Sequence, residues 1–490
     1  MEQHVTSRRA LRDPRILSAE VMAGVLTTLA LVPEVVSFSV VAGVDPQVSL
    51  VASVVLAISM SFLGGRSAMV TAAAGSVALV VAPLVKGHGV EYLLPAVVLA
   101  GAIQIVFGVT GLARTMRFVP RSVMLGFVNA LGVLIFAAQV QHLVDVPVVA
   151  YVLFAVTVAI VLGLPRLTRA VPAPLVAIVV VTGIAWVMSG HVPDVGDEGA
   201  IGGGLPGWTH LDVPLDLETL QIIWPTALSI AFVGLLESLL TAKVVDDLTD
   251  TGSSKTRESW ALGVANVLAG FYGGIAGCAM IGQSIVNVKI GRARTRISTI
   301  VAGLALLLFI TMLSGLVAHI PMVALAAVMM IVAINTVDWH SVRPSTLRHM
   351  PRSETAVLLV TIGTVVATEN LAAGVAVGVL LALILFARRV SGVMRVHRTV
   401  SEDGSTVHYR VVGPLFFGSS HDLPEHFGHP DDPASVVIDL SEGQVWDVSS
   451  VAVIESIQAR YEARGSQVAV TGLDDRSSAF RDRLAGRLSG

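Results

Sequence analysis

Cysteine is almost absent from this sequence: Cys278 is the only one among 490 residues. A lone cysteine excludes an intrachain disulfide, an iron–sulfur cluster and a cysteine-based zinc site. Charged residues are also scarce, at 14%, whereas soluble domains carry about a quarter. The formal net charge of -3 gives no indication of nucleic-acid binding. The composition therefore argues against a soluble enzyme or a nucleic-acid-binding protein.

What the sequence has in abundance is apolar residues, at 54%, with a mean hydropathy of +0.78. It also has 45 glycines, and small residues allow membrane-spanning helices to approach closely. Four arginines (Arg8, Arg9, Arg12 and Arg15) precede the first apolar run, and no small-residue cleavage site follows it. We therefore expect a membrane protein whose first span is retained.

Two zones follow a short N-terminal segment, residues 1–17. Residues 18–390 form a train of apolar segments, and residues 400–490 have the pattern of a soluble α/β domain. A segment inside the lipid must satisfy its backbone groups internally, which favours helices throughout the first zone. Fourteen segments are predicted, at residues 18–38, 44–63, 71–85, 91–112, 120–141, 147–164, 171–189, 221–243, 258–272, 278–290, 295–317, 321–338, 354–370 and 371–390.

The charges between segments predict the orientation, because loops rich in lysine and arginine stay in the cytoplasm. The connection 190–220 is acidic and has neither Lys nor Arg, so it is expected outside; its acidic residues are Asp194, Asp197, Glu198, Asp212, Asp216 and Glu218. Four alternate joints are basic, through Arg114, Arg117 and Arg121; Arg166 and Arg169; Lys289, Arg292, Arg294 and Arg296; and Arg343, Arg348 and Arg352. Both termini are therefore expected in the cytoplasm, with the chain in the plasma or inner membrane.

The acidic connection divides the zone into halves of seven segments, 18–190 and 221–390. The third segment of each half is short and flanked by small residues, a pattern typical of an inverted repeat with a binding site at the bilayer midplane. Close helix packing alone is the alternative explanation. Two half-helices that begin inside the membrane present free N–H groups to an anion. We place this cradle at Ala73, Ala74 and Gly75 on one side and at Ile281, Gly282 and Gln283 on the other.

Three carboxylates, Glu34, Glu237 and Glu369, occur within apolar segments, where ionised groups are costly and commonly functional. Thr241 shares a helical face with Glu237 because it lies four residues further on. A carboxylate beside an anion site can bind a proton or a cation and couple its movement to that of the anion. A hydrogen-bonded structural glutamate is the alternative for Glu34 and Glu237, and a turn or cap explains Glu369.

Enzyme chemistry is not expected, since the sequence offers no nucleophile–base pair and its histidines have no ligand-like spacing. No metal site and no cofactor are predicted beyond Na⁺ or H⁺ as a coupling ion. In the soluble zone, strands are predicted at Val407–Val412, Ser435–Leu440 and Gln467–Thr471. A helix is predicted from Ser450 to Arg464, with Val453, Ile454, Ile457 and Tyr461 on one face.

Several of these stretches resemble signatures of the sulfate permease (SulP) family of anion transporters. They are Gly24 to Pro46, with Pro33-Glu34 and Asp45-Pro46; Leu235 to Thr241; Asn266 to Asn287; and Thr368 to Leu371, with Gly374 and Gly378. Gly413 to Ser419 and Asp447 to Ser450 look like the STAS domain (sulfate transporter and anti-sigma-factor antagonist). The resemblance covers essentially the whole chain.

The resemblance implies an α-helical membrane protein with a seven-plus-seven inverted repeat, divided into core and gate domains that work as an elevator, followed by a small α/β STAS domain. It also implies a homodimer. Glu34 and Phe38 stand where the family lines its anion pocket, and Gly282 and Gln283 match the start of the tenth helix. Glu237 and Thr241 match residues that help to hold the cation in sodium-coupled bicarbonate members.

Two departures from the family pattern bear on the substrate. Many members have Gln at Glu34 and Pro where this chain has Ala73-Ala74. A carboxylate at Glu34 would repel a divalent anion unless it were protonated, which favours proton-coupled symport or a smaller anion such as bicarbonate. Chloride exchangers carry a basic side chain where this chain has Gln283. Bicarbonate, sulfate and C4-dicarboxylates all remain compatible with the cradle.

In antagonist proteins with a STAS domain, a serine at the position of Ser449 can be phosphorylated. Here Ser449 is interpreted as the cap of a helix, with phosphorylation as the alternative. Two other functions remain open for the chain. A nucleobase permease shares the seven-plus-seven architecture but generally lacks a STAS domain. A non-transporting scaffold or sensor would not need carboxylates beside broken helices.

Overall fold

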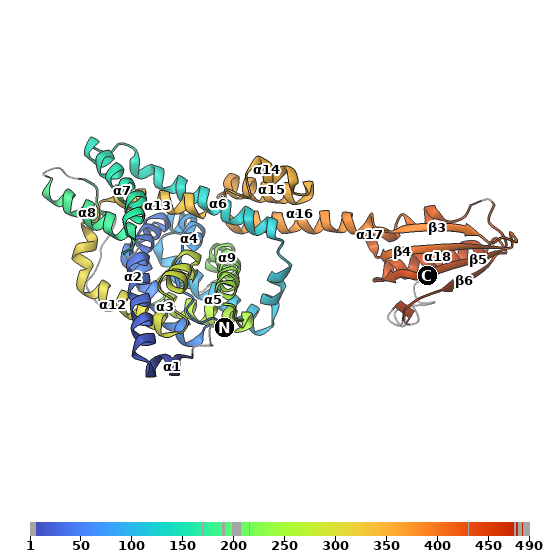
Figure 1. Ribbon diagram of the computed structural model, residues 1–490, viewed down its shortest axis with the longest axis horizontal. Coiled ribbons are helices and arrows are strands. Elements are labelled where there is room, and N and C mark those ends of the chain that lie inside the picture. The colour runs from blue at the N-terminus through green and yellow to red at the C-terminus, as the bar shows by residue number, and fades with distance from the viewer. Residues whose placement is uncertain are drawn as a thin grey trace. The chain divides into compact units, whose positions relative to one another are not determined.

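The computed structural model describes residues 6–168, 171–188, 192–197, 207–214, 216–429, 431–474, 477, 478 and 483. Arg169 and Glu198, used above for the charge asymmetry, lie outside the described residues. The chain divides into two compact units, with the boundary between Val379 and Leu380. The first unit is an assembly of helices, and the second contains a sheet with a helix against it (Figure 1).

The first half of the helical unit consists, in chain order, of α1 (Ser7–Arg12), α2 (Pro14–Ala42), α3 (Pro46–Leu63), β1 (Thr71–Ala73), α4 (Gly75–His88), η1 (Val90–Tyr92), α5 (Leu93–Val109), η2 (Leu112–Phe118), α6 (Arg121–Val140), η3 (Gln141–Leu143), α7 (Val148–Leu167) and α8 (Ala173–Val187). Each of the first seven predicted segments contains one long helix of this series.

The second half consists of η4 (Val195–Asp197), α9 (Leu217–Thr249), α10 (Lys255–Phe271), β2 (Gly277–Ala279), α11 (Ile281–Ile285), the π-helical turn η5 (Val286–Ile290), α12 (Ile297–Ala318), α13 (Met322–Thr336), α14 (Pro344–His349), α15 (Arg352–Thr368) and α16 (Leu371–Ser391). Six of the remaining seven predicted segments also coincide with long helices, whereas segment 278–290 contains the end of β2, the short α11 and η5. Among the described residues, seven helices are long and apolar enough to cross a membrane, and four shorter apolar helices accompany them.

The first long helix of each half begins at an aspartate. Asp13 accepts a hydrogen bond from the Arg15 amide at 3.0 Å, and Asp216 accepts one from the Thr219 amide at 2.8 Å. A side-chain oxygen at this position satisfies an N–H group that has no partner within the helix. α2 ends at Gly43, whose φ of 72° is accessible to glycine without steric cost. Corresponding caps thus define where the two halves begin.

Glycines let helices of the two halves approach at backbone distance. A Cβ on Gly101 of α5 would lie 2.6 Å from the Gly263 carbonyl of α10, and a Cβ on Gly263 would lie 2.5 Å from the Gly101 carbonyl. Neither position can accept a larger residue without moving a helix. This contact confirms that glycine serves close helix packing in this chain.

Two three-residue strands bridge the halves. β1 pairs with β2 in antiparallel register, with Thr71 opposite Ala279, Ala72 opposite Cys278 and Ala73 opposite Gly277. All six residues are buried. Non-helical backbone inside a membrane must find its hydrogen-bond partners within the protein. The pairing of β1 with β2 supplies such partners, so both segments can be non-helical inside the membrane.

The second unit has a four-stranded sheet in the order β3-β4-β5-β6. The strands are β3 (Arg395–Val400), β4 (Thr406–Leu415), β5 (Ser435–Val445) and β6 (Gln467–Thr471). β3 and β4 are antiparallel, whereas β4–β5 and β5–β6 are parallel. The helical elements of this unit are α17 (Phe417–Ser420), η6 (Leu423–His426) and α18 (Val448–Glu462).

The core of this sheet comes from alternate residues of its central strands, which follows from the two-residue period of a strand. It contains Val407, Tyr409 and Val411 of β4 and Val436, Ile438 and Leu440 of β5. α18 covers them with Ile454, Ile457 and Tyr461, while Val453 is partly buried beside them. The predicted strands and the predicted helical face are therefore confirmed. β3 was not predicted.

The cap of α18 is not Ser449, as the sequence suggested, but Asp447. The Asp447 carboxylate accepts hydrogen bonds from the amide of Ser450 at 3.0 Å and from its hydroxyl at 2.8 Å. Ser449 is the second residue of the helix and is exposed. Asp447 is favoured at the N-cap because its negative charge also interacts favourably with the positive end of the helix dipole.

Candidate functional site

The antiparallel pairing of β1 and β2 determines how the two half-helices meet. Each strand leads directly into a short helix: β1 into α4, which begins at Gly75, and β2 into α11, which begins at Ile281. Since paired strands run in opposite directions, α4 and α11 leave the ribbon at opposite ends with their N-termini near it. The structure thus brings together the two groups of residues predicted as a cradle.

The start of α11 faces open space. A Cβ on Gly282 would have no atom within 4 Å, and Gly282 is exposed although Gln283 and Ser284 beside it are buried. Met280, at the N-cap, makes no side-chain hydrogen bond to the first turn of this described helix. The first amides of α11 therefore border a space that a small ligand can reach.

The start of α4 is more enclosed. Gly75 lies against the ring of Phe38, since a Cβ on Gly75 would be 2.6 Å from its Cε1 atom. The Ala73 amide donates to the Ser53 hydroxyl at 3.1 Å, so the structure removes this N–H from the predicted cradle. Ala74, at the N-cap, provides no side-chain hydrogen bond to the helix, as expected for alanine. On this side, the amides at Ala74 and Gly75 are the candidates that remain.

Glu34 and Phe38 lie one helical turn apart on α2 and both face these helix starts. The Glu34 carboxylate is partly buried and lies within hydrogen-bonding reach of the Gln283 side chain. Phe38 is buried against Gly75. α2 therefore closes the cradle with one acidic and one aromatic side chain.

Glu237 of α9 is buried, and it contacts both α4 and β2, the strand that leads into α11. Its carboxylate accepts a hydrogen bond from the Ser76 hydroxyl of α4 and another from the Cys278 thiol of β2, the latter at 3.1 Å. The Ser76 hydroxyl and the Cys278 sulfur are also 3.7 Å apart. One carboxylate thus connects α9, α4 and β2.

Thr241 lies one turn beyond Glu237, as predicted. Its hydroxyl donates to the carbonyl of Glu237 at 2.8 Å and to that of Ala279 at 2.9 Å. Ser238 accepts a hydrogen bond from the Ala279 amide at 3.0 Å. These contacts hold β2 against α9.

Two further polar residues brace β2 from α10 and α5. The Asn266 side chain accepts from the Gly277 amide at 2.8 Å and donates to the Gly277 carbonyl at 3.2 Å. It also donates to Gln104 at 2.8 Å. The amide side chain of asparagine can satisfy both backbone groups of one residue, which suits a strand with few ladder partners.

Glu369 behaves as the sequence indicated. It terminates α15 with a φ of 53° and is exposed at the turn before α16. Over the described part of the chain, no group of three or more His, Cys, Asp or Glu side chains is arranged to hold a metal ion.

The sequence reasoning missed Ser76, Cys278, Ser53 and Asn266 as residues that shape the site. Each is a small polar residue in an apolar segment, which is the one signal that could have marked it. Such residues also occur where they only bond to the preceding helical turn, as the Ser37 hydroxyl does to the Pro33 carbonyl. The signal does not distinguish the two cases.

Comparisons with known proteins bear on both units. The model described as "Sulfate permease family" matches residues 17–162 and 145–361, and the STAS domain model matches residues 397–479. The chain belongs to the sulfate permease family. The resemblance noted from the motifs is therefore confirmed, including the C-terminal STAS domain.

Among its relatives, the putative sulfate transporter YbaR of Bacillus subtilis (strain 168) is 46% identical over 466 residues, covering 95% of this chain and 96% of that protein. The bicarbonate transporter BicA of Synechocystis sp. is 24% identical over 519 residues, covering 96% of this chain and 91% of that protein. Relatives named for two different anions therefore align with nearly the whole chain.

Solved structures share the fold. The murine Slc26a9 anion transporter in the inward-facing state superposes with a TM-score of 0.83 at 16% identity, covering 97% of this chain and 88% of that chain. The transmembrane domain of a cyanobacterium bicarbonate transporter, BicA, superposes with a TM-score of 0.66 at 24% identity. The match covers 74% of this chain and 98% of that chain.

These findings assign the chain to a class of transporters. It is a multi-pass membrane protein of an anion-transporter family, with a helical transporter unit and a small α/β STAS domain. Its relatives are transporters and not enzymes. The nucleobase permease and the non-transporting scaffold are both less consistent with these relationships than anion transport is.

Proposed function

We propose that the protein is a secondary active transporter that carries a small anion, bound between the starts of α4 and α11. The observation that carries this proposal is the open space at Gly282, where the first amides of α11 lie without a capping side chain. Free amides and the positive end of a helix dipole favour an anion without needing a lysine or arginine. In this proposal Glu34, Phe38, Ala74, Gly75, Ile281 and Gln283 complete the binding site.

Glu237 and Thr241 are proposed to hold the coupling ion, H⁺ or Na⁺. The Glu237 carboxylate uses one oxygen for both Ser76 and Cys278, which leaves its other oxygen for a proton or a cation. Thr241 adds a hydroxyl oxygen one helical turn away. Because Ser76 belongs to α4, charge at Glu237 acts directly on the start of that half-helix.

The anion is proposed to be bicarbonate, sulfate or a C4-dicarboxylate. Relatives named as sulfate and bicarbonate transporters support the first two. The Glu34 carboxylate beside Gln283 favours a monovalent anion, because an ionised glutamate would repel a divalent one more strongly. Binding of sulfate at this position would require Glu34 to be protonated.

Movement and assembly are proposed by analogy with the family fold. The unit containing α4, α9 and α11 would carry the anion across the membrane as an elevator, against a gate that includes α6, α13 and α15. We further propose a homodimer in the plasma or inner membrane with both termini in the cytoplasm. The acidic stretch before α9 and the arginines near α14 support this orientation. The exposed Ser449 is a candidate for regulatory phosphorylation.

The test is uptake by purified protein reconstituted in liposomes. Labelled bicarbonate, sulfate and fumarate would each be offered with an imposed proton or sodium gradient. Uptake of one anion driven by one gradient would identify both the substrate and the coupling ion. If uracil were taken up and none of the three anions were, the proposed function would be wrong.

A further inference from the structure

A cavity of about 1160 Å³ opens in the helical unit well away from the anion cradle. It is lined by α1, the start of α2, the connection from α3 to β1, the end of α9, η5 and the segment that follows η5. Leu248, at its α9 wall, lies eleven residues beyond Glu237, which places it about 16 Å further along the helix. The cavity is therefore a different site from the one described above.

The lining of this cavity is strongly basic. Its described residues include six cationic side chains and a single carboxylate, Glu20; the cationic ones are Arg9, Arg15, Arg66, Lys289, Arg292 and Arg294. They come from four separate segments of the chain, so the concentration of charge is produced by the fold. Arg66 is paired with Asp246, and the Arg294 guanidinium donates to the carbonyls of Val288 and Ala293. The exposed Arg15, Lys289 and Arg292 repel one another, and an anion between them would relieve this repulsion.

The Glu20 carboxylate accepts hydrogen bonds from the backbone of the opposite wall. One oxygen accepts from the amides of Arg294 at 2.8 Å and Thr295 at 2.9 Å, and the other accepts from the Ser298 amide at 3.2 Å. Glu20 is buried by these contacts. Through these amides it ties the start of α2 to the start of α12.

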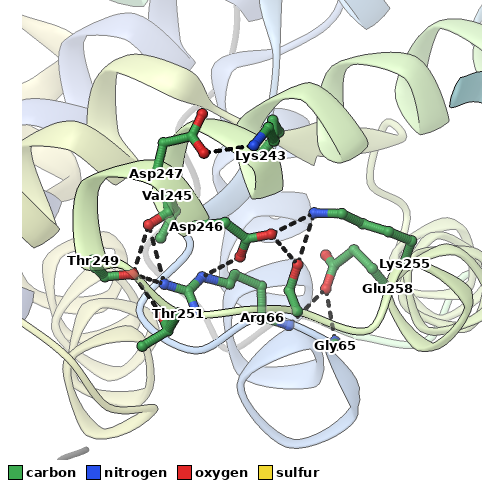
Figure 2. A network of polar contacts seen from close by, with 11 residues as sticks. Gly65, Arg66, Lys243, Val245, Asp246, Asp247, Thr249, Thr251, Lys255 and Glu258 are labelled. Carbon is green, nitrogen blue, oxygen red and sulfur yellow. Dashed lines mark hydrogen bonds and ion pairs between the residues drawn. The ribbon is translucent and has the colours of Figure 1, made fainter.

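Arg66 is held in place by a polar network (Figure 2). Its guanidinium lies 3.3 Å from Asp246, donates to Thr251 at 2.8 Å, and also donates to Thr249. Asp246 is shared with Lys255, at 2.8 Å. The charge of this guanidinium is thus paired with Asp246, whereas the exposed Lys289, Arg292 and Arg15 can adapt to an oxyanion.

The cavity lies at the edge of the apolar zone. Leu11 of α1 and Met22 of α2 are exposed by 63% and 67%, on either side of the cavity-lining residues Arg15 and Ile16. Large exposed apolar side chains beside basic ones are typical of a surface at the membrane interface. A phosphate group attached to a lipid, or one free in solution, could reach this position.

We propose that this cavity binds a phosphate group carrying two or more negative charges. Arginine matches phosphate oxygens in a bidentate fashion, and basic pockets between membrane helices bind phosphorylated head groups. The site is large enough to hold a phosphate together with the group that bears it. Its occupant would tie α2, α9 and η5 together at one end of the unit, so binding stabilises the folded protein. The inference does not depend on which anion is transported.

The test measures two probes on the full-length protein. Inorganic pyrophosphate is titrated by calorimetry into detergent-purified protein, and thermal unfolding is followed in nanodiscs containing phosphatidic acid or only phosphatidylcholine. The variant is Arg15→Gln combined with Arg292→Asn; asparagine suits position 292 because its φ is 59°. The matched control is Arg348→Gln, an exposed arginine of α14 outside the cavity.

We expect the double variant to bind pyrophosphate at least about tenfold more weakly, since two charge-assisted contacts are lost, and the control to bind as the wild type does. Phosphatidic acid is expected to raise the unfolding midpoint of the wild type and not of the double variant. Response to pyrophosphate alone identifies a free phosphate as the ligand, and response to phosphatidic acid alone identifies a lipid. Absence of both responses, or equal responses in the double variant, overturns the proposal. If the double variant does not fold, Lys289→Gln is used in the same comparison.

Discussion

Glu237 of α9 accepts a hydrogen bond from the hydroxyl of Ser76, the second residue of α4. The two residues are 161 positions apart in the chain, one in each half of the helical unit. Through this contact, any change in the charge of Glu237 alters the electrostatic environment at the start of a half-helix. The proposed coupling residue therefore contacts the first turn of α4 directly, at the residue next to Gly75 of the proposed anion site.

Replacing Glu237 by Gln is expected to reduce gradient-driven anion uptake by roughly tenfold or more, because the amide cannot take up a proton and lacks the negative charge that favours a cation. The fold should survive, since the Gln oxygen can still accept from Ser76. The measurement is initial uptake in liposomes together with the thermal unfolding midpoint. Glu369→Gln, at an exposed turn, is the control and should transport normally. Wild-type uptake by Glu237→Gln would exclude the coupling role.

Gly282→Ala tests whether the ligand approaches the start of α11. A Cβ at this position meets no protein atom within 4 Å, so stability should change by less than about 0.5 kcal/mol. If an anion occupies this space, the added methyl group should raise KM for the anion several-fold. Gly87→Ala in α4, which also meets no atom within 4 Å, is the matched control. An unchanged KM in both variants would place the anion elsewhere.

Gly75→Ala is expected to destabilise the protein by about 1–3 kcal/mol, because its Cβ would overlap the Phe38 ring. Combining it with Phe38→Leu should recover part of this loss, since the smaller side chain leaves room. Unfolding midpoints of the two single variants and the double variant form a mutant cycle that measures the contact. Strict additivity would mean that the two residues do not touch.

The environment of Asp432 predicts how the stability of the STAS domain depends on pH. Burial raises its pKa, but hydrogen bonds from Tyr409, Tyr461 and Arg398 outweigh burial and lower the pKa below its ordinary value of 3.8. A depressed pKa stabilises the folded state above pH 3.8, and that stability is lost as the pH falls through the lowered value.

Asp432→Asn should therefore lower the stability of the STAS domain by about 1–3 kcal/mol at neutral pH. The difference from the wild type should shrink in acid, below the ordinary pKa of an aspartate. Chemical unfolding of a fragment beginning at residue 392 at several pH values measures it, with Asp431→Asn, at the exposed neighbouring residue, as the control. A difference that stays constant with pH would contradict this explanation.

The helices were predictable because the lipid restricts the backbone so strongly. Glu237 and Thr241 were placed correctly on one helical face from their spacing alone. The pairing of Ala72 with Cys278 was not predicted, since a three-residue strand of small residues has no pattern of its own and exists only through its partner. The involvement of Ser53 with the Ala73 amide was missed for the same reason. Contacts between distant segments decide which amides stay free.

In the STAS domain, the alternation of Val407, Tyr409 and Val411 predicted a strand with one buried face. β3 lacks this alternation because almost all of its side chains are exposed. Ser449 was mistaken for the cap because serine and aspartate are both good N-cap residues and stand two positions apart. Only the geometry of the first turn, in which Asp447 accepts two hydrogen bonds from Ser450, decides between them.

The pairing of β1 with β2 also has a consequence for the biosynthesis of the protein. The ribosome completes Ala72 long before it reaches Cys278, so the backbone groups of β1 lack their partner while about two hundred further residues are made. Unpaired backbone is costly in lipid. The segment from β1 into α4 is therefore expected to settle into its final position only after β2 has been synthesised, and a nascent chain ending before β2 should expose this segment to proteases or chaperones.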